Sequence, residues 1–270
     1  MIQQTVRVLW NSIECSSGEC SGYFRMGLEC DGYADAGPGQ FVMVRSGDNI
    51  NPLLRRPFSI HRLIREKDRV SGIELLYKIV GTGTQFLSSC GKGHNLDLLG
   101  PLGNSFSISP DFRRIFIVAG GIGVAPMFFL TSVLGETGVN LGECKVFIGG
   151  RSKDDLLCMN DFFNIGMETV HITTDDGSAG IHDRVTGPLE SAIIEGRPDM
   201  IYACGPQPML KNTAAIAEKY EVPCQISIET MMACGIGACL GCAVNNKNAE
   251  GKYLHACANG PVFNSGTVAL

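Results

Sequence analysis

The strongest constraint on how this chain can fold is a glycine- and cysteine-rich stretch, residues 229–257. It contains four of the twelve cysteines, with four, two and fourteen residues between them: Cys234, Cys239, Cys242 and Cys257. A C-x4-C-x2-C run with a distant fourth cysteine is the plant-type ligand spacing of a 2Fe-2S cluster. Glycine and alanine between the thiols let backbone N–H groups approach inorganic sulfide closely. We therefore expect these four cysteines to bind iron from a tight loop and one returning strand.

Two other uses of these cysteines have to be weighed. A structural zinc site normally has two C-x2-C pairs, whereas here only Cys239 and Cys242 form one. Disulfides need an oxidising compartment, and residues 1–10 lack the basic and apolar regions of a secretory signal. The gap before Cys257 is shorter than in plant ferredoxins. The stretch is expected to be a short relative of that module, with zinc as the alternative.

Composition limits the class of protein. A chain of 270 residues with 44% hydrophobic residues has room for two domains and a small appended module. A net charge of −5 and no run of Lys or Arg argue against nucleic acid as a partner. We expect small-molecule or protein partners and a cytoplasmic location. Residues 115–134 carry no charge, but their central glycines and Pro126 favour a buried strand, a turn and a helix over a membrane span.

Short β-type runs dominate the first hundred residues, which predicts an antiparallel β-barrel. The runs are residues 5–10, 21–29, 39–45, 56–62, 72–80 and 95–100. One helix is expected over residues 84–90, with Thr84 as its N-cap. Cys15, Cys20 and Cys30 form no compact ligand pair, so we interpret them as ordinary thiols.

From residue 114 the pattern changes to apolar strands alternating with helices, which predicts a doubly wound parallel α/β sheet. The expected strands are residues 115–120, 145–150, 169–174, 200–205 and 225–229. Three domains are predicted: a barrel over 1–102, an α/β domain over 103–225 and the cysteine module over 226–270. The fold class is therefore multidomain.

A group of polar and glycine residues in the barrel could bind a flavin nucleotide. A guanidinium such as Arg56 can hold a pyrophosphate at two points, and a glycine turn at a helix start offers N–H groups to phosphate. The candidate residues are Arg56, Pro57, Phe58, Ser59, Leu76, Tyr77, Lys78, Gly83 and Thr84. Each of these signals is weak when taken singly, because Arg-x-x-Ser on a strand more often marks a solvated face.

A second group, in the α/β part, could bind a nicotinamide dinucleotide. Glycines at the end of the first strand permit a pyrophosphate to approach the next helix. Asp175, after the third strand, would repel the 2′-phosphate of NADPH and accept from the free ribose hydroxyl, which favours NADH; Asp-Asp-Gly is also good turn chemistry. The candidates are Gly120, Gly121, Gly123, Asp175, Cys204 and Gly205.

In this order and spacing the motifs resemble the ferredoxin-NADP reductase superfamily. In that superfamily the arginine holds the FAD pyrophosphate, the aromatic residue lies against the flavin ring, the serine lies near its reactive nitrogen, and a C-G-P turn lies beside the nicotinamide. The whole chain further resembles the electron-transfer subunits of type B dihydroorotate dehydrogenase. That resemblance rests on RRPFSI, GGIGVAPM, CGPQPML, MACGIGACLGCAV and CANGPVF. Two departures are Phe58 in place of the common Tyr and the lack of a C-terminal aromatic residue over the flavin.

The resemblance implies an NADH-dependent oxidoreductase subunit of pyrimidine (UMP) biosynthesis. It would bind FAD and a 2Fe-2S cluster, use NAD(H), and serve an FMN-containing catalytic subunit, as a heterotetramer of two copies of each. The dihydroorotate chemistry would belong to that partner, so no catalytic residue is assigned here. One alternative is an NAD(P)H-dependent reductase subunit of another complex, ferredoxin-linked or sulfur-reducing. A second is a zinc-containing scaffold or a flavin-binding module without enzyme activity.

Overall fold

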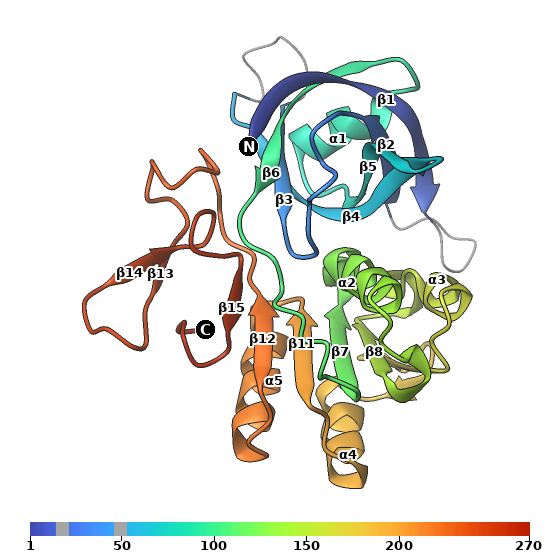
Figure 1. Cartoon of the computed structure of the whole chain (residues 1–270), viewed down its shortest axis with the longest axis vertical. Helices are drawn as coiled ribbons and strands as arrows, with labels where there is room; N and C mark the ends of the chain where they lie inside the picture. The colour runs from blue at the N-terminus through green and yellow to red at the C-terminus, as the bar shows by residue number, and fades with distance from the viewer. Residues whose placement is uncertain (15–21, 46–52) are drawn as a thin grey trace.

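The computed structural model describes residues 1–14, 22–45 and 53–270, and the upper half of Figure 1 is a closed antiparallel barrel. Its strand order is β1-β2-β5-β4-β3-β6. The strands are β1 (Ile2–Glu14), β2 (Tyr23–Glu29), β3 (Phe41–Arg45), β4 (Arg56–Glu66), β5 (Arg69–Lys78) and β6 (Asn95–Leu102). The predicted barrel is thus confirmed. Cys30 is buried, which raises the pKa of its thiol to about 12, while Cys15 and Cys20 lie outside the described residues.

The barrel helix starts earlier than the sequence suggested. Helix α1 spans Thr82–Ser89, and its N-cap is Gly81. Thr84 is therefore the third helical residue, and the expectation that it caps the helix is wrong. Its hydroxyl instead accepts hydrogen bonds from the N–H groups of Val80 and Gly81, at 2.9 and 3.2 Å. This reciprocal contact stabilises the first turn from inside the helix.

The second half is a seven-stranded sheet with the order β10-β9-β8-β7-β11-β12-β15. Six strands are parallel: β7 (Ile115–Gly120), β8 (Lys145–Gly150), β9 (Thr169–Thr174), β10 (Ile181–His182), β11 (Met200–Cys204) and β12 (Cys224–Ser227). β15 (Val262–Asn264) pairs antiparallel with β12 at the edge. The predicted parallel sheet is confirmed, whereas β10 and β15 were not anticipated.

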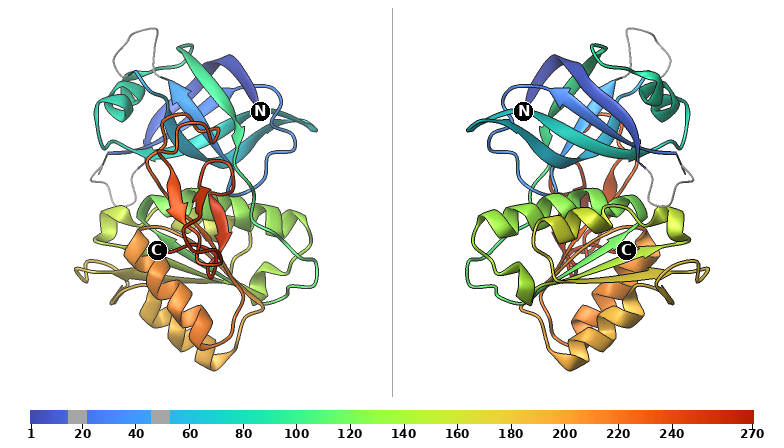
Figure 2. Two further views of the ribbon diagram at one scale, coloured as in Figure 1. Left: turned by 90° about the vertical axis from the view of Figure 1, so that its left-hand side faces the viewer. Right: turned by 90° about the vertical axis from the view of Figure 1, so that its right-hand side faces the viewer.

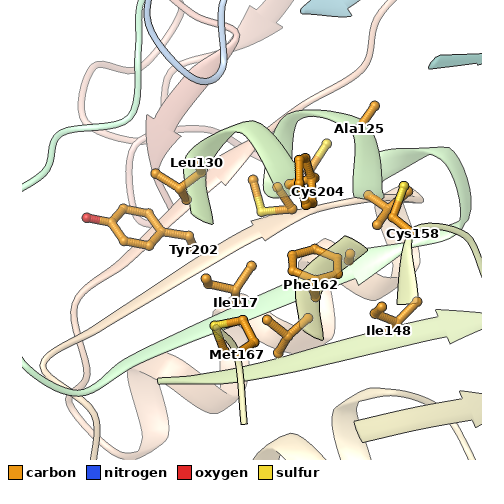
Figure 3. Packing of buried hydrophobic residues seen from close by; sticks show 14 of the residues in the cluster. Ile117, Ala125, Leu130, Ile148, Cys158, Phe162, Met167, Tyr202 and Cys204 are labelled. Carbon is orange, nitrogen blue, oxygen red and sulfur yellow. The ribbon is translucent and has the colours of Figure 1, made fainter. Parts of the chain in front are cut away.

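Helices cover both faces of this sheet. Figure 2 shows α2 (Val124–Glu136) between the barrel and the sheet, with α4 (Thr186–Glu195) and α5 (Gln207–Lys219) on the opposite face. In Figure 3, Ile117, Ile148 and Tyr202 of the strands lie with Leu130 of α2 and Phe162 of α3 (Met159–Asn164) in one buried cluster. Short 3-10 turns complete the domain: η1 (Gly121–Gly123), η2 (Leu141–Glu143) and η3 (Lys153–Asp155). Among the described residues, no helix has the length and apolar character to cross a membrane.

Charged side chains connect the barrel to the α/β part. Arg25 of β2 and Arg62 of β4 each contact a carboxylate oxygen of Asp161 in α3, at 2.5 and 2.7 Å. Arg25 also pairs with Glu14 at 2.7 Å. A second connection joins Tyr23 to Asp155 of η3 at 2.7 Å. The barrel and the α/β part thus contact each other through ion pairs as well as through helix α2.

The C-terminal segment packs against both halves. It carries a hairpin of β13 (Ala243–Asn245) and β14 (Tyr253–His255), at the left of Figure 1, before the chain joins the sheet as β15. Asn104, in the connection after the barrel, donates to Val262 O and accepts from Val262 N–H, at 2.8 and 3.0 Å. β12 also spans the predicted boundary between residues 225 and 226. The three domain limits stay predictions.

Candidate functional site

A cavity of about 520 Å³ lies between the barrel and the sheet. All nine residues predicted to bind flavin line it: Arg56, Pro57, Phe58, Ser59, Leu76, Tyr77, Lys78, Gly83 and Thr84. They come from β4, from the end of β5 and from the start of α1. Residues far apart in the sequence thus form one wall of this cavity.

Two neighbouring arginines at the start of β4 have different surroundings. Arg55 donates to Asp97 of β6 at 2.5 Å and does not line the cavity. Arg56 lines the cavity and forms no ion pair within the described ranges; its guanidinium donates to the carbonyl of Leu54 at 2.9 Å. Arg56 is therefore the cation with spare charge for a phosphate group.

The aromatic residues of this wall are mostly buried. Phe58 is 9% exposed and meets the ring of Tyr77 edge-on, with centroids 5.8 Å apart. Tyr77 donates its hydroxyl to Asn11 at 3.1 Å, and burial raises its pKa. Ser59, the next residue of the strand, is only partly buried. This wall is held rigid by barrel packing, which favours a fixed ligand position.

The start of α1 closes the cavity at one end. Gly81, Thr82, Gly83 and Thr84 all line it. The first N–H groups of a helix lack intrahelical partners and attract anions. The Thr84 hydroxyl is occupied by the contacts within its own turn, so backbone N–H groups rather than this side chain are available there.

A second cavity, of about 670 Å³, follows the C-terminal ends of the parallel strands. Five of the six residues predicted to bind nicotinamide dinucleotide line it: Gly120, Gly121, Gly123, Asp175 and Gly205. Cys204 lines the first cavity instead, and burial raises the pKa of its thiol. The Cys204–Gly205 turn therefore separates the two cavities.

Packing explains two of the glycines. A Cβ on Gly123 would lie 2.3 Å from the carbonyl oxygen of Cys204, and one on Gly120 would lie 2.6 Å from the sulfur of Met209. Both positions require glycine, because the turn that follows β7 packs directly against the turn that follows β11. Gly121 has φ +51° and open space above it, so its conformation and its access to a ligand favour glycine. The glycine pattern thus reports protein packing as well as ligand approach.

The two cavities meet at a small set of shared residues, Lys78, Val80, Ile122 and Glu229. Glu229 was not singled out from the sequence, because a lone carboxylate after a strand has no local pattern. Its side chain faces cavity space, yet surrounding protein desolvates the carboxyl and raises its pKa. A ligand in one cavity can therefore touch a ligand in the other at this junction.

The far end of the second cavity carries polar residues that the sequence did not reveal. Arg151 follows β8, Thr173 lies in β9, and Arg184 precedes α4. They share the cavity wall with Asp175. Single cations in loops give no sequence signal, and only the strand order brings them together.

The cysteine loop brings together the thiols that the spacing predicted. Cys242 and Cys257 are buried with sulfur atoms 3.2 Å apart, whereas Cys234 is half-buried and Cys239 exposed. Gly237 N–H donates to Cys257 Sγ at 3.0 Å and Ile236 N–H to Cys234 Sγ at 3.5 Å. Such N–H groups stabilise thiolates and fit iron–sulfur ligands.

The pKa values of Cys234 and Cys257 are shifted in opposite directions from the usual thiol value. Desolvation raises the pKa of Cys234, but N–H groups of the loop outweigh it and lower that pKa to about 6. Desolvation and the neighbouring Cys242 raise the pKa of Cys257 to about 12. Across the described ranges, no three side chains of His, Cys, Asp or Glu gather closely enough to hold a single metal ion.

The cysteine loop is next to the first cavity. Thr230 and Met232 line that cavity, and Cys234 follows Met232 by two residues. A Cβ on Gly235 would lie 2.6 Å from Met43 of β3, so the loop packs directly on the barrel. A group held by the thiols is therefore close to a molecule in the first cavity.

Around the thiols the surface is apolar. Met231, Ile236 and Leu240 are 87%, 49% and 65% exposed. Leu240 also has φ +60°, an unusual conformation for a bulky residue. Exposed apolar side chains gathered at one loop are typical of an interaction surface.

Comparison with known families agrees with this geometry. A family model described as the iron-sulfur cluster binding domain of dihydroorotate dehydrogenase B matches residues 229–269. A second, described as the oxidoreductase NAD-binding domain, matches residues 117–215.

Curated relatives match most of the chain. The electron transfer subunit of dihydroorotate dehydrogenase B (NAD(+)) from Desulforamulus reducens is 38% identical over 231 residues, which is 84% of this chain and 85% of the relative. The protein of the same name from Caldanaerobacter subterraneus subsp. tengcongensis is 39% identical, with 84% of each chain covered. That from Enterococcus faecalis is 38% identical, with 86% and 87% covered.

Solved structures share the fold. The structure of an NADH-dependent reduced ferredoxin-NADP oxidoreductase has a TM-score of 0.81 and 27% identity, covering 98% of this chain and 89% of that one. A ferredoxin NADP+ reductase from Neisseria gonorrhoeae, at 13% identity and a TM-score of 0.64, covers 81% of this chain and 91% of its own; it supports the fold alone.

Proposed function

The chain belongs to the family of electron transfer subunits of dihydroorotate dehydrogenase B, and from this premise we propose that it connects NAD(H) to an FMN-containing catalytic subunit. It is an NADH-dependent oxidoreductase subunit whose cofactors are FAD and a 2Fe-2S cluster. Its pathway is the synthesis of pyrimidines, through the dihydroorotate step that gives the relatives their name.

One observation carries this proposal: the order of the three sites. The glycine-lined cavity shares Ile122 and Glu229 with the barrel cavity, and the barrel cavity shares its wall with the segment that leads to Cys234. The proposed sites for NAD(H), FAD and the cluster are thus next to one another in space, in that order. Bound FAD converts two-electron hydride transfer into the one-electron steps that an iron–sulfur cluster accepts.

We assign the FAD site to the residues of the barrel cavity. The Arg56 guanidinium binds the pyrophosphate, assisted by N–H groups of Gly83 and Thr84 at the start of α1. Phe58 lies against the flavin ring, and Ser59 donates to its edge. Pro57, Leu76, Tyr77 and Lys78 complete the walls.

We assign NAD(H) to the second cavity. Gly120, Gly121 and Gly123 receive the pyrophosphate, and Asp175 accepts from the adenosine ribose. Cys204 and Gly205 position the nicotinamide toward the flavin. Ile122 and Val80 lie at the junction between this cavity and the flavin cavity.

The cluster and its partner complete the assignment. Cys234, Cys239, Cys242 and Cys257 ligate the irons, and the apolar surface around Leu240 docks the catalytic subunit. We propose a heterotetramer of two copies of each subunit, in the cytoplasm. Residues 1–102, 103–225 and 226–270 then hold FAD, NAD(H) and the cluster respectively.

An anaerobic titration of the purified protein with NADH tests the proposal. Flavin absorbance should bleach, and an EPR signal from the reduced cluster should follow within the same titration. Metal analysis should give two irons and two acid-labile sulfides per chain. A protein with stoichiometric zinc, without sulfide, or with a flavin that NADH leaves oxidised, contradicts the assignment.

A reductase subunit of another complex remains the second candidate. The observation in its favour is the likeness over 98% of the chain to the NADH-dependent reduced ferredoxin-NADP oxidoreductase structure. The titration above does not separate the two, because both use the same cofactors. Reconstitution with the dihydroorotate catalytic subunit does, as described in the Discussion.

A further inference from the structure

Two arginines flank Asp175 at the end of the dinucleotide cavity that lies away from the flavin. Arg151 and Arg184 line this cavity together with Asp175. The nicotinamide belongs at the opposite end, where the Cys204–Gly205 turn meets the flavin cavity. This far end is therefore the place of the adenosine half of the dinucleotide.

Backbone hydrogen bonds fix the arginines on either side of Asp175. On the β8 side, Asp175 N–H donates to Gly150 O at 3.0 Å, and Asp176 N–H donates to Arg151 O at 3.1 Å. On the β10 side, a ring nitrogen of His182 lies 3.0 Å from the carbonyl oxygen of Asp175, and Arg184 follows His182 by two residues. The strand ends thus place the backbone of Asp175 between the segments that carry Arg151 and Arg184.

These charges are largely uncommitted within the protein. Across the described ranges, neither Asp175 nor Arg184 forms a side-chain ion pair. Arg151 has one weak contact, from Nε to Asp155 Oδ2 at 3.7 Å, and its side chain is 81% exposed. The other charged residues that line this cavity are Lys78 and Asp155, which pair with each other at 3.1 Å, and Glu229 at the junction with the flavin cavity. Two positive charges and one negative charge without a close partner therefore line the cavity away from the junction.

A buried hydroxyl adds an independent observation. Thr173 is 1% exposed and lines the same cavity, yet its Oγ1 has no hydrogen-bond partner among the described residues. A buried polar group without a hydrogen-bond partner destabilises the folded protein. A polar ligand at this end would supply the missing partner.

We propose that Arg151 and Arg184 form an anion subsite beside Asp175, and that the Asp175 carboxylate alone keeps a ribose 2′-phosphate out of it. The inference rests on the assignment of this cavity to NAD(H). A phosphate ester carries a charge of about −1.5 to −2, which Asp175 repels and the guanidiniums attract. Removing the carboxylate is then sufficient to admit the phosphate, because its cationic partners are already in place.

The test measures binding of two adenosine half-ligands, 5′-AMP and adenosine 2′,5′-bisphosphate, to the protein loaded with flavin and cluster. Wild type should bind 5′-AMP at least as tightly as the bisphosphate. Asp175→Asn should bind the bisphosphate about ten- to a hundredfold more tightly than wild type, while its affinity for 5′-AMP changes by less than about threefold. Adding Arg151→Ala and Arg184→Ala to Asp175→Asn should abolish the gain. High salt should reduce the gain in bisphosphate affinity of Asp175→Asn, because salt screens the attraction between charges.

Two controls separate local from general charge effects. Asp176→Asn removes the neighbouring carboxylate, which bonds to Ser178 and does not line the cavity. Arg69→Ala removes an exposed cation of the barrel. Both should leave the affinities for both half-ligands unchanged.

The outcomes distinguish the subsite from the cavity assignment. If Asp175→Asn binds 5′-AMP but gains nothing for the bisphosphate, or keeps its gain without the two arginines, the anion subsite is wrong while the NAD(H) site stands. If Asp176→Asn gives the same gain, the effect is one of net charge and the subsite is again wrong. If neither the wild type nor any variant binds 5′-AMP, the assignment of this cavity to NAD(H) is wrong. The anion subsite is then wrong as well.

Discussion

Four single thiols are the proposed iron ligands of this chain. We expect replacement of Cys234, Cys239, Cys242 or Cys257 by Ser to abolish the cluster, because on the proposed assignment each thiolate is one of four iron ligands. Visible absorbance, iron and acid-labile sulfide should all fall, and the flavin should remain. Cys90→Ala is the control, since that buried thiol donates to Phe86 O at 3.4 Å within the barrel. Loss of iron in the control, or its retention in all four Ser variants, contradicts the ligand assignment.

A matched pair of arginines tests the flavin site. Arg56→Ala should weaken FAD binding by about ten- to a hundredfold, because a charge-assisted hydrogen bond contributes about 1.5–3 kcal/mol. Arg55→Ala is the control, since Arg55 pairs with Asp97 and does not line the cavity. Recovery of FAD fluorescence on dilution measures dissociation. Equal FAD affinity in both variants would place the phosphates elsewhere.

Residues of the site could be predicted where several share a short motif. Arg56, Phe58 and Ser59 lie within four residues, and the cysteines follow a fixed spacing, so the sequence singled out both groups as candidates. Glu229 and Arg184 each stand alone in the sequence. Their place in the cavities depends on strand order, which no local pattern contains.

At the scale of secondary structure, α3 is held to the barrel by one carboxylate. Desolvation raises the pKa of Asp161, but Arg25 and Arg62 outweigh it, so the pKa lies below its usual range. A carboxyl whose pKa is lower when folded than when unfolded stabilises the protein above the unfolded pKa, near 4. That stability is lost as the pH falls through the folded pKa.

Asp161→Asn should therefore lower stability at pH 7 by about 1–3 kcal/mol, because two guanidiniums lose their partner. For a chain of this size, each 1 kcal/mol corresponds to about 2–4 °C in Tm. Thermal unfolding of both proteins at matched pH measures the difference, which should narrow as the pH is lowered from 5 toward 3. Asp68→Asn, in an exposed turn, is the control. A difference that stays constant with pH would show that the ion pairs are not its source.

Most strands could be predicted, because alternation in the barrel and continuous apolar runs in the sheet are strong patterns. The start of α1 could not be predicted, because its N-cap residue, Gly81, has no side chain that would mark it in the sequence. Thr84, three residues later, is of a type that commonly caps helices, so the sequence favours it as the N-cap. β15 was missed for another reason. It has only three residues, and they pair with β12 beside the contacts that Asn104 makes with Val262 and that Gln225 makes with Ser107. No local pattern in the sequence contains these distant contacts.

At the scale of the whole molecule, the cysteine loop carries an apolar surface with no use in the isolated chain. Met231 and Leu240 are 87% and 65% exposed on the loop that carries Cys234, Cys239 and Cys242. Leu240 lies between Cys239 and Cys242 and has a left-handed conformation, φ +60°, which a bulky residue seldom adopts without a reason. An apolar contact that excludes water and brings two redox centres close would provide that reason.

The last prediction concerns this surface and the partner. Alone, the protein should oxidise NADH with artificial acceptors and leave dihydroorotate and orotate unchanged. Adding the FMN-containing catalytic subunit should create NAD-linked interconversion of the two. Leu240→Glu should weaken assembly by at least about tenfold, because a charge would be buried in an apolar contact, while artificial-acceptor activity stays near wild type. Ile194→Glu is the matched control, since Ile194 is 69% exposed on α4, on the sheet face opposite the barrel.

Size-exclusion chromatography and a coupled assay measure assembly and activity separately. If Ile194→Glu weakens assembly as much as Leu240→Glu, the docking surface lies elsewhere or the effect is one of net charge. If the chain alone converts dihydroorotate, the division of chemistry between two subunits is wrong. If the catalytic subunit neither binds nor gains NAD-linked activity, while a ferredoxin accepts electrons from the reduced cluster, the partner belongs to another complex. The same cofactor order would then serve that acceptor, because Cys239 and Leu240 would still be exposed on the cysteine loop.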